Sequence, residues 1–328
     1  VDASIEIGLW NDRVTTEIAY YNKLSQDVIM NVSTPPSTGF TNRWDNVATI
    51  LNRGVELSVK SRNLIGGFQW TTELNVARNY NELQSIGNYT PDAVSGGTND
   101  SRVITGSPVG SFYLMMFSHV DAETGLPVYL DRAGNETFDY DNSERQYVGD
   151  GLPDFVGGMT NTFRWKNWDL RALATFSYGA KIFDSSSKRQ LGVVTSWNMR
   201  TEILDRWRQP GDEATFPRLT LDETTYGLPS GFPWWNTSLF VFDASYLRLR
   251  NLTLGYTVPT IGTGKHAISN LRVNASVTNL FTITSFPGLD PEVVRDFENA
   301  QDRNMSPNVT YLTPPQERAF TLGINMSF

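Results

Sequence analysis

The stretch Phe320-Thr-Leu-Gly-Ile-Asn-Met-Ser-Phe328 at the end of the chain carries the clearest pattern in the sequence. Its large apolar residues alternate with Thr321, Gly323, Asn325 and Ser327. An alternation of period two predicts a β-strand with one apolar face and one polar face. Such a strand suits a membrane barrel, whose faces meet lipid and a watery lumen, and it also suits a soluble sandwich with one wet face.

The composition favours many strands joined by turns. Of 328 residues, 39% are hydrophobic, 12% are aromatic and only 19% are charged. No apolar run approaches the roughly 18 residues of a membrane-spanning helix. The net charge of −8 argues against a nucleic-acid partner, since such binding relies on clustered Lys and Arg. The lack of cysteine excludes disulfides and thiolate zinc sites.

The alternation recurs along the whole chain. It predicts nine long strands, at residues 3–10, 14–22, 53–63, 68–80, 155–165, 168–182, 241–258, 270–282 and 318–328. A strand of about fifteen residues at 168–182 exceeds the roughly 5 to 6 of globular strands and the roughly 9 to 11 of tilted membrane strands. The length therefore favours a large antiparallel barrel whose wall projects beyond the bilayer.

The connections between these strands alternate strictly in length. They are short at 11–13, 64–67, 166–167 and 259–269, and long at 23–52, 81–154, 183–240 and 283–317. In outer-membrane barrels short turns face the periplasm and long loops face outside, so the last strand is expected to end in the periplasm. The first strand would also run downward, which leads us to expect that the chain is part of a longer barrel.

Two local features fit a membrane barrel. Trp10, Trp165 and Trp168 stand at turn boundaries, where aromatic rings form the interfacial girdle; the alternative is aromatic pairing in the hairpins of a soluble sheet. In the second feature, the alternation of the strand at 241–258 changes phase at Arg250-Asn251. This phase change predicts a β-bulge that restores the register.

Four segments in order carry a resemblance to a known family. They are Tyr246-Leu-Arg-Leu-Arg-Asn-Leu-Thr-Leu-Gly-Tyr256 with Thr-Val-Pro259 after it; Asn52-Arg-Gly-Val-Glu-Leu57; Leu271-Arg-Val-Asn-Ala-Ser-Val-Thr-Asn-Leu-Phe281 with Asp290-Pro-Glu292 after it; and Arg318-Ala-Phe-Thr-Leu-Gly-Ile-Asn-Met-Ser-Phe328. Together they resemble SusC/RagA-type TonB-dependent outer-membrane receptors. The resemblance spans essentially the whole chain, and the ordered set is more specific than any single segment.

The resemblance implies an all-β fold, an antiparallel transmembrane β-barrel of about 22 strands with long extracellular loops. Residues 1–328 would form its C-terminal portion of about nine or ten strands, with the plug domain and the N-terminal strands absent from this chain. The implied function is import of an oligosaccharide or peptide across the bacterial outer membrane. The implied partners are a SusD-like surface lipoprotein, outer-membrane lipid, and the TonB complex, reached through the missing N-terminal part.

Two other functions stay open. The chain could be a structural or passively conducting outer-membrane barrel component of a larger assembly, since it carries no plug. A soluble carbohydrate-binding β-sandwich array is disfavoured by the strand lengths and the aromatic turn boundaries. Loss of substrate uptake on deleting tonB would separate the first of these from an importer.

The long connection at 183–240 is rich in aromatic residues that could stack on a sugar or a peptide side chain. The expected ligand-binding residues are Trp197, Tyr226, Phe232, Trp234 and Trp235. An alternative applies to the neighbouring segment 198–208, where Ile203, Leu204 and Trp207 have helical spacing. These residues predict a short helix packed on the barrel rim.

The acidic connection around residues 121–154 offers a weak calcium site. Asp131, Asn135, Asp139 and Asp141 supply the oxygen ligands that Ca²⁺ prefers, although they lack the spacing and closing Glu of an EF-hand. The alternative is a solvated acidic loop. No other cofactor is expected.

Catalytic patterns are sparse. The chain has only two histidines, His119 and His266, and no Gly-x-Ser-x-Gly elbow, His-Glu-x-x-His helix or phosphate-binding glycine loop, so an enzyme is not expected. The terminal Phe328 is expected to act as the signal that the barrel-assembly machinery reads. Alternatively, it is simply the last lipid-facing position.

Overall fold

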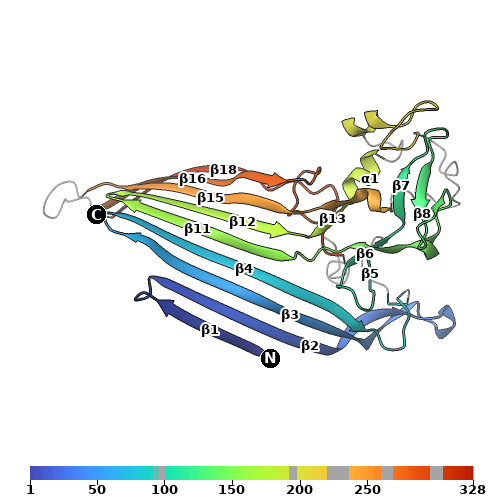
Figure 1. Cartoon of the computed structure of the whole chain (residues 1–328), viewed down its shortest axis with the longest axis horizontal. Helices are drawn as coiled ribbons and strands as arrows, with labels where there is room; N and C mark the ends of the chain where they lie inside the picture. The colour runs from blue at the N-terminus through green and yellow to red at the C-terminus, as the bar shows by residue number, and fades with distance from the viewer. Residues whose placement is uncertain are drawn as a thin grey trace.

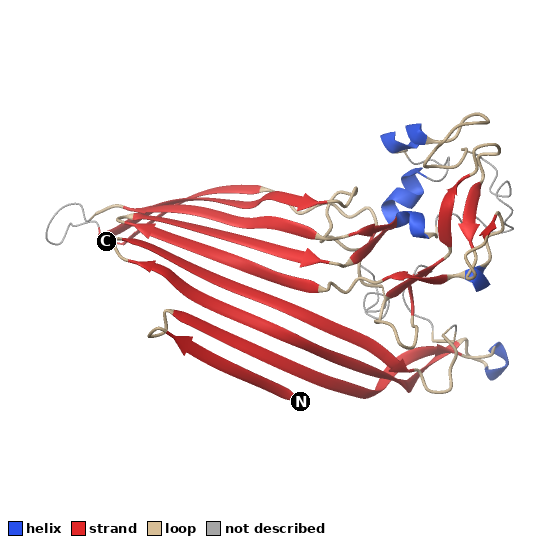
Figure 2. Cartoon of the chain, viewed as in Figure 1, coloured by secondary structure: helices blue, strands red, loops and turns tan. Residues whose placement is uncertain are grey.

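The protein is a curved antiparallel sheet with a smaller layer of loops at one end (Figure 1). This computed structural model describes residues 1–91, 93–94, 101–191, 198–219, 236–259, 269–295 and 306–327. Strands dominate, and the few helices are short and lie in the loop region (Figure 2). The all-β antiparallel fold class is confirmed, and the sheet has the form of part of a barrel.

The large sheet, which we call the wall, contains nine strands, and each hydrogen-bonds antiparallel to the next. In spatial order they are β1 (Asp2–Leu9), β2 (Val14–Ser33), β3 (Asn42–Ile65), β4 (Phe68–Ser85), β11 (Phe155–Trp165), β12 (Trp168–Tyr178), β15 (Tyr246–Thr257), β16 (Ser269–Thr284) and β18 (Ala319–Ser327). All nine predicted strands are therefore present in the predicted order, although several bounds differ.

The short turns gather at one rim of the wall, together with the end of β18, and the long connections gather at the other rim (Figure 1). The turn between β11 and β12 holds only Lys166 and Asn167, and Lys166 has a φ of 52°. In the turn after β1, Trp10, Asn11 and Asp12 also have positive φ angles. Tight hairpin turns require such left-handed conformations because they must follow the twist of the strands.

The prediction of a long connection at 23–52 is wrong. β2 and β3 run on to 20 and 24 residues, and only residues 34–41, with the short helix η1 (Pro36–Thr38), join them. The register of this pair shifts near Asp27, whose φ is 55°. The bulge reverses which residues face outward, so the simple alternation is lost although the hydrogen-bonded ladder continues.

Two predicted strands each divide into two. The strand predicted at 168–182 leaves the wall at Gly179, which has a φ of 92°, and continues as β13 (Lys181–Asp184). The strand predicted at 241–258 begins as β14 (Val241–Asp243), a separate short strand before β15. β13 pairs with β14 and, in parallel, with β17 (Val309–Thr310). The alternation continues through both breaks, which explains the error.

The long connections fold into a second region, which we call the loop layer. Besides β13, β14 and β17, it contains β5 (Ser101–Arg102), β6 (Ser111–Leu114), β7 (Met116–Val120), β8 (Pro127–Leu130), β9 (Glu136–Thr137), β10 (Gln146–Gly149), α1 (Ser185–Leu191), η2 (Asn142–Glu144), η3 (Thr201–Asp205) and η6 (Ser238–Phe240). Within the described residues, no helix has the length and apolar character needed to cross a membrane.

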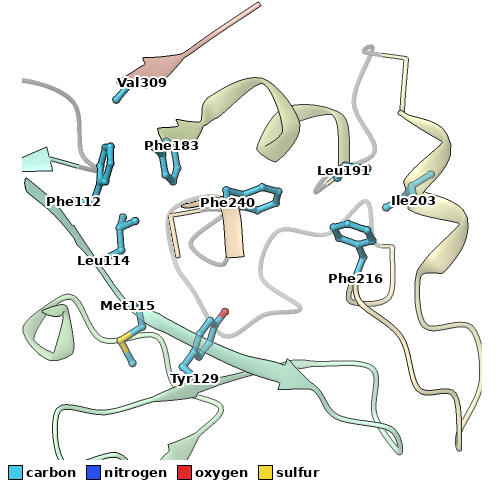
Figure 3. Packing of buried hydrophobic residues seen from close by; sticks show 10 residues of the cluster. All are labelled: Phe112, Leu114, Met115, Tyr129, Phe183, Leu191, Ile203, Phe216, Phe240 and Val309. Atoms are coloured by element: carbon cyan, nitrogen blue, oxygen red, sulfur yellow. The ribbon is translucent and has the colours of Figure 1, made fainter. Parts of the chain in front are cut away.

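The loop layer has its own hydrophobic core (Figure 3). Its buried members are Phe112, Leu114, Met115, Tyr129, Phe183, Leu191, Ile203, Phe216, Phe240 and Val309. They come from the three connections that follow β4, β12 and β16. Because each connection contributes side chains to the same core, the loop layer packs as one body rather than as separate loops.

The helix predicted at 198–208 is shorter than expected and does not pack on the barrel rim. The helix η3 covers only Thr201–Asp205. Ile203 is buried in the loop-layer core, whereas Leu204 is exposed. Trp207 donates from Nε1 to the carbonyl of Ala122 at 2.7 Å, so this segment is held by the loop layer.

Candidate functional site

The outward face of the wall is apolar. The register aligns Leu170, Leu254, Ala275 and Leu322 in one row across four strands. On β18, Phe320 and Leu322 are 73% and 75% exposed. A continuous band of exposed apolar side chains on a closed or closing sheet is typical of a surface that faces lipid.

The expected aromatic girdle is present at the rim of the short turns. Trp165 and Trp168 are paired in the register, and the ring of Trp168 lies 4.6 Å from that of Tyr256 on the next strand. Trp10 stands in another turn on the same rim and is exposed. Indole and phenol rings suit this level because one end of each ring is apolar and the other can hydrogen-bond.

The inward face of the wall is polar and carries a depression of about 910 Å³. The inward residues of β1 to β4 that line it include four glutamates and one lysine, namely Glu6, Glu17, Glu56, Glu73 and Lys60. Glu6 lies directly opposite Glu17 in the register, while Lys60 pairs with Glu73 at 2.9 Å. On this side the depression is therefore predominantly acidic.

The other side of the depression is built by β15 and by the connection that follows β16. Tyr246, Arg250 and Glu292 line it there. The hydroxyl of Tyr246 donates to Glu292 at 2.7 Å, and Arg250 pairs with the same carboxylate. The connection after β16 thus reaches the inside of the wall and contributes to the surface that a ligand in the lumen would meet.

Arg248 lies behind this edge and is only 2% exposed. It pairs with Asp290 at 2.5 Å and with Glu292 at 3.0 Å. Asp290 also accepts hydrogen bonds from the backbone N–H groups of Glu292 and Gln316. Burial opposes ionisation of Asp290, but the hydrogen bonds from Arg248 and from the two N–H groups outweigh it and hold the pKa of this carboxyl below its usual value.

The predicted bulge is confirmed. Leu173 faces Asn251 and the next residue, Ala174, faces Leu249, so Arg250 is the extra residue in β15. The bulge adds Arg250 to the inward series that Tyr246 and Arg248 begin. Arg250 therefore lies on the same face as Arg248, and both arginines reach the carboxylates on the connection after β16.

These contacts bring two segments of the family resemblance together in space. The arginines of Tyr246-Leu-Arg-Leu-Arg250 bind the two acids of Asp290-Pro-Glu292. Neither segment is informative about the other in the sequence. The alternation did indicate which side chains of β15 face inward, and that was the available signal for this part of the site.

The five aromatic residues predicted to bind ligand, Trp197, Tyr226, Phe232, Trp234 and Trp235, lie outside the described residues. The predicted assembly signal at Phe328 and the histidine at 266 also lie outside them. The structure therefore does not test these predictions. The sequence reasoning did not single out the inward acids or the edge formed by Tyr246, Arg250 and Glu292.

The predicted calcium ligands are spread along a chain of local turns. Asp131 accepts hydrogen bonds from the N–H of Asn135 at 2.8 Å and from its side-chain amide at 2.9 Å, which lowers the pKa of Asp131. Asp141 accepts from the N–H of Ser143 and caps η2, which lowers the pKa of Asp141. Over the described ranges, no group of three His, Cys, Asp or Glu is placed to hold a metal ion.

The remaining histidine is not part of a catalytic cluster. His119 lies on β7, half-exposed, with Nδ1 3.5 Å from a carboxylate oxygen of Glu136 and 3.0 Å from the hydroxyl of Ser118. An exposed pair of this kind contributes little energy.

Comparisons with known proteins agree with the fold. No protein-family model matches the chain. The TonB-dependent receptor P3 of Formosa agariphila is 27% identical over all of this chain and 34% of its own length. The TonB-dependent receptor SusC of Bacteroides thetaiotaomicron is 25% identical over all of this chain and 31% of its own length. The chain thus spans about a third of the length of these curated relatives.

A solved structure of the RagAB peptide transporter covers all of this chain with a TM-score of 0.81 at 22% identity, and 35% of that chain is covered. At this identity the match supports the fold. The names of the relatives agree with the expectation that the chain is not part of an enzyme. Fold and relatives together confirm the resemblance of this chain to SusC/RagA-type TonB-dependent outer-membrane receptors, to part of whose barrel it corresponds.

Proposed function

We propose that the chain forms part of the barrel of an outer-membrane importer, which takes up an oligosaccharide or a peptide with energy supplied through TonB. One observation carries this proposal: a single sheet presents an apolar face outward and, on its inward face, a polar depression of about 910 Å³. A barrel with this arrangement can hold a hydrophilic ligand inside the membrane. The relatives named as TonB-dependent receptors support the energy source.

The proposed orientation is supported by the two rims. Short turns lie at the rim where β18 ends, and the loop layer lies at the opposite rim (Figure 1). In outer-membrane barrels the long loops are extracellular, which would place the loop layer at the cell surface and the end of β18 in the periplasm. A SusD-like surface lipoprotein would then bind at the loop layer.

Uptake measurements test the proposal. The full-length gene would be deleted and restored in its host, and uptake of labelled oligosaccharide and peptide mixtures compared with and without tonB. We expect uptake of one mixture to require both the receptor and TonB. Uptake that requires the receptor but continues unchanged without tonB would support the passively conducting component instead.

The five loop aromatics offer a test of ligand binding. Replacing Trp234 and Trp235 by Ala should weaken binding of the imported mixture, because stacked aromatic faces contribute contact area and about 0.5–1.5 kcal/mol per pair. Leu204→Ala, an exposed change in the same connection, serves as the control and should leave binding unaltered. If the Trp variants bind the mixture as well as the control does, Trp234 and Trp235 are not part of the binding site.

The partnership can be tested separately from transport. A tagged full-length receptor purified in mild detergent should retain a SusD-like surface lipoprotein. If the lipoprotein is absent from the purified receptor while uptake still depends on TonB, the importer proposal stands and the partner proposal fails.

A further inference from the structure

We infer that the two described parts of the connection between β16 and β18 form a strap, which is fixed to the inside of the wall by a buried ion-pair network and does not act as a movable lid. The strap is defined by the described residues 285–295 and 306–318. It is attached at two levels, to β15 inside the wall and to β13 in the loop layer. This inference concerns the attachment alone and does not depend on the proposed import.

The inner attachment is a buried arginine with two carboxylates. Arg248 and Asp290 are 2% and 6% exposed, and both partners of Arg248 belong to the strap. A guanidinium is costly to bury, and its partners offset that cost only while they stay in place. If the strap moved away, Arg248 would therefore remain buried without the two carboxylates that pair with it.

A second arginine ties both described parts of the strap. Arg250, the bulge residue, pairs with Glu292 in the first part and donates to Oε1 of Gln316 in the second at 2.6 Å. Gln316 in turn donates its backbone N–H to Asp290 at 3.1 Å. The two parts are thus joined to each other as well as to β15.

The outer attachment joins the strap to the loop layer. Val309 of β17 pairs in parallel with Phe183 of β13, and both side chains lie in the loop-layer core. The side-chain amide of Asn308 donates to the carbonyl oxygens of Gly151 and Lys181 at 2.9 and 3.2 Å. If the strap moved away from β13, it would therefore have to open the hydrophobic core of the loop layer and not only a surface contact.

The strap consequently fixes one edge of the inward depression. Glu292 lines the depression beside Tyr246 and Arg250, and Arg248 holds Glu292 from behind. Arg248 is thus a positioning residue for this edge.

Hydrogen–deuterium exchange of the full-length receptor in detergent tests the inference. In Arg248→Met, amide exchange in peptides covering 289–295 and 306–318 should rise on the order of a hundredfold, since breaking a buried ion pair strongly destabilises its surroundings. Exchange in β2 and β3 should stay unchanged. A strap that already exchanges as fast in the unaltered receptor as in Arg248→Met would overturn the inference.

Arg171→Met is the matched control. Arg171 lies on the inward face of β12 and makes no ion pair with any residue that the structure describes. Its replacement should leave strap exchange unchanged. Because Arg248→Met could block assembly, Glu292→Gln is the second variant: it keeps the size of the side chain and removes the charge that both arginines share. Unchanged strap exchange in an assembled Glu292→Gln receptor would equally overturn the inference.

Discussion

The wall and the loop layer place apolar side chains in opposite ways. On the wall, Phe320 and Leu322 point away from the protein and are largely exposed. In the loop layer, Phe112 and Phe183 are completely buried in a core that resembles that of a small soluble domain. One chain thus contains an apolar surface that suits lipid and a hydrophobic core that excludes water. The two regions meet where strands leave the wall, as at Gly179.

The wall and the loop layer are therefore stabilised in different solvents. The wall gains its hydrophobic stabilisation from lipid outside the protein, so its strands need only the correct side chain on the correct face. The loop layer must remove its apolar side chains from water by packing them together, so it requires contacts between distant segments. Substitutions that act on only one of these requirements can separate the two regions.

The largest effect is expected from emptying the loop-layer core. Phe240→Ala removes a ring that is 1% exposed and should destabilise the loop layer by about 3–5 kcal/mol, through lost burial and the cavity left behind. Hydrogen exchange of β13 and α1 should accelerate, while exchange in the wall strands β2 and β3 should stay unchanged. Leu204→Ala is the exposed control, and a similar acceleration in that variant would contradict the assignment of the core.

A charge on the outward face should have the next largest effect. Leu322→Arg places a guanidinium in the lipid-facing row near the middle of β18 and should cost about 2–4 kcal/mol. Thr321→Arg, one residue away on the inward face, should be tolerated. Unfolding in lipid vesicles measures both, and equal costs for the two variants would show that the faces are not distinguished by lipid.

Acid should release the strap with a smaller effect, because a protonated Asp290 can still hydrogen-bond to its neighbours. The pKa of Asp290 is lowered in the folded protein, so its contribution is complete above the ordinary value of 3.8 and is lost as pH falls through the lower, folded value. The charged and titratable groups around it are Arg248, Arg250, Glu292 and Tyr246.

Strap exchange, corrected for the intrinsic effect of pH, should therefore be constant from pH 7 to about pH 5 and rise only below about pH 4. The Asp290→Asn variant should lack this rise. A transition near neutral pH in the unaltered receptor would contradict the role of Asp290.

The smallest effect is expected from the ion pair on the watery face of the wall. Lys60 and Glu73 are 2.9 Å apart, but their side chains are 56% and 50% exposed. Lys60→Met should change the free energy of unfolding by less than about 1 kcal/mol, and raising the salt concentration should reduce even that difference. A larger, salt-independent loss would mean that this pair is shielded from water in the complete receptor.

The strands of the wall were predictable because lipid and lumen impose a local pattern on each of them. Phe320 to Met326 on β18 and the phase change at Arg250 could be read directly from the residue order. The divisions at Gly179 and before Tyr246 could not, since the pattern continues through both. They follow from the pairing of β13 with β14 and β17, which come from different parts of the chain.

For the candidate site, the sequence predicts only which face of its strand each side chain lies on. Alternation indicates that Glu17, Glu56 and Arg248 share the inward face, but it does not indicate which of them has a partner. Arg248 and Asp290 are separated by 42 residues, and nothing local to either residue identifies the other. The residues expected to bind ligand were chosen by composition, and they lie outside the part of the chain that the structure describes.

Long strands with one apolar side could be predicted from the sequence, because this requirement acts on neighbouring residues through the period of the strand. The inward course of the last connection and the core that three connections share could not be read from the order of residues. The physical reason is that burying a charge or an aromatic ring depends on partners distant in the chain, and these meet only when the sheet has formed.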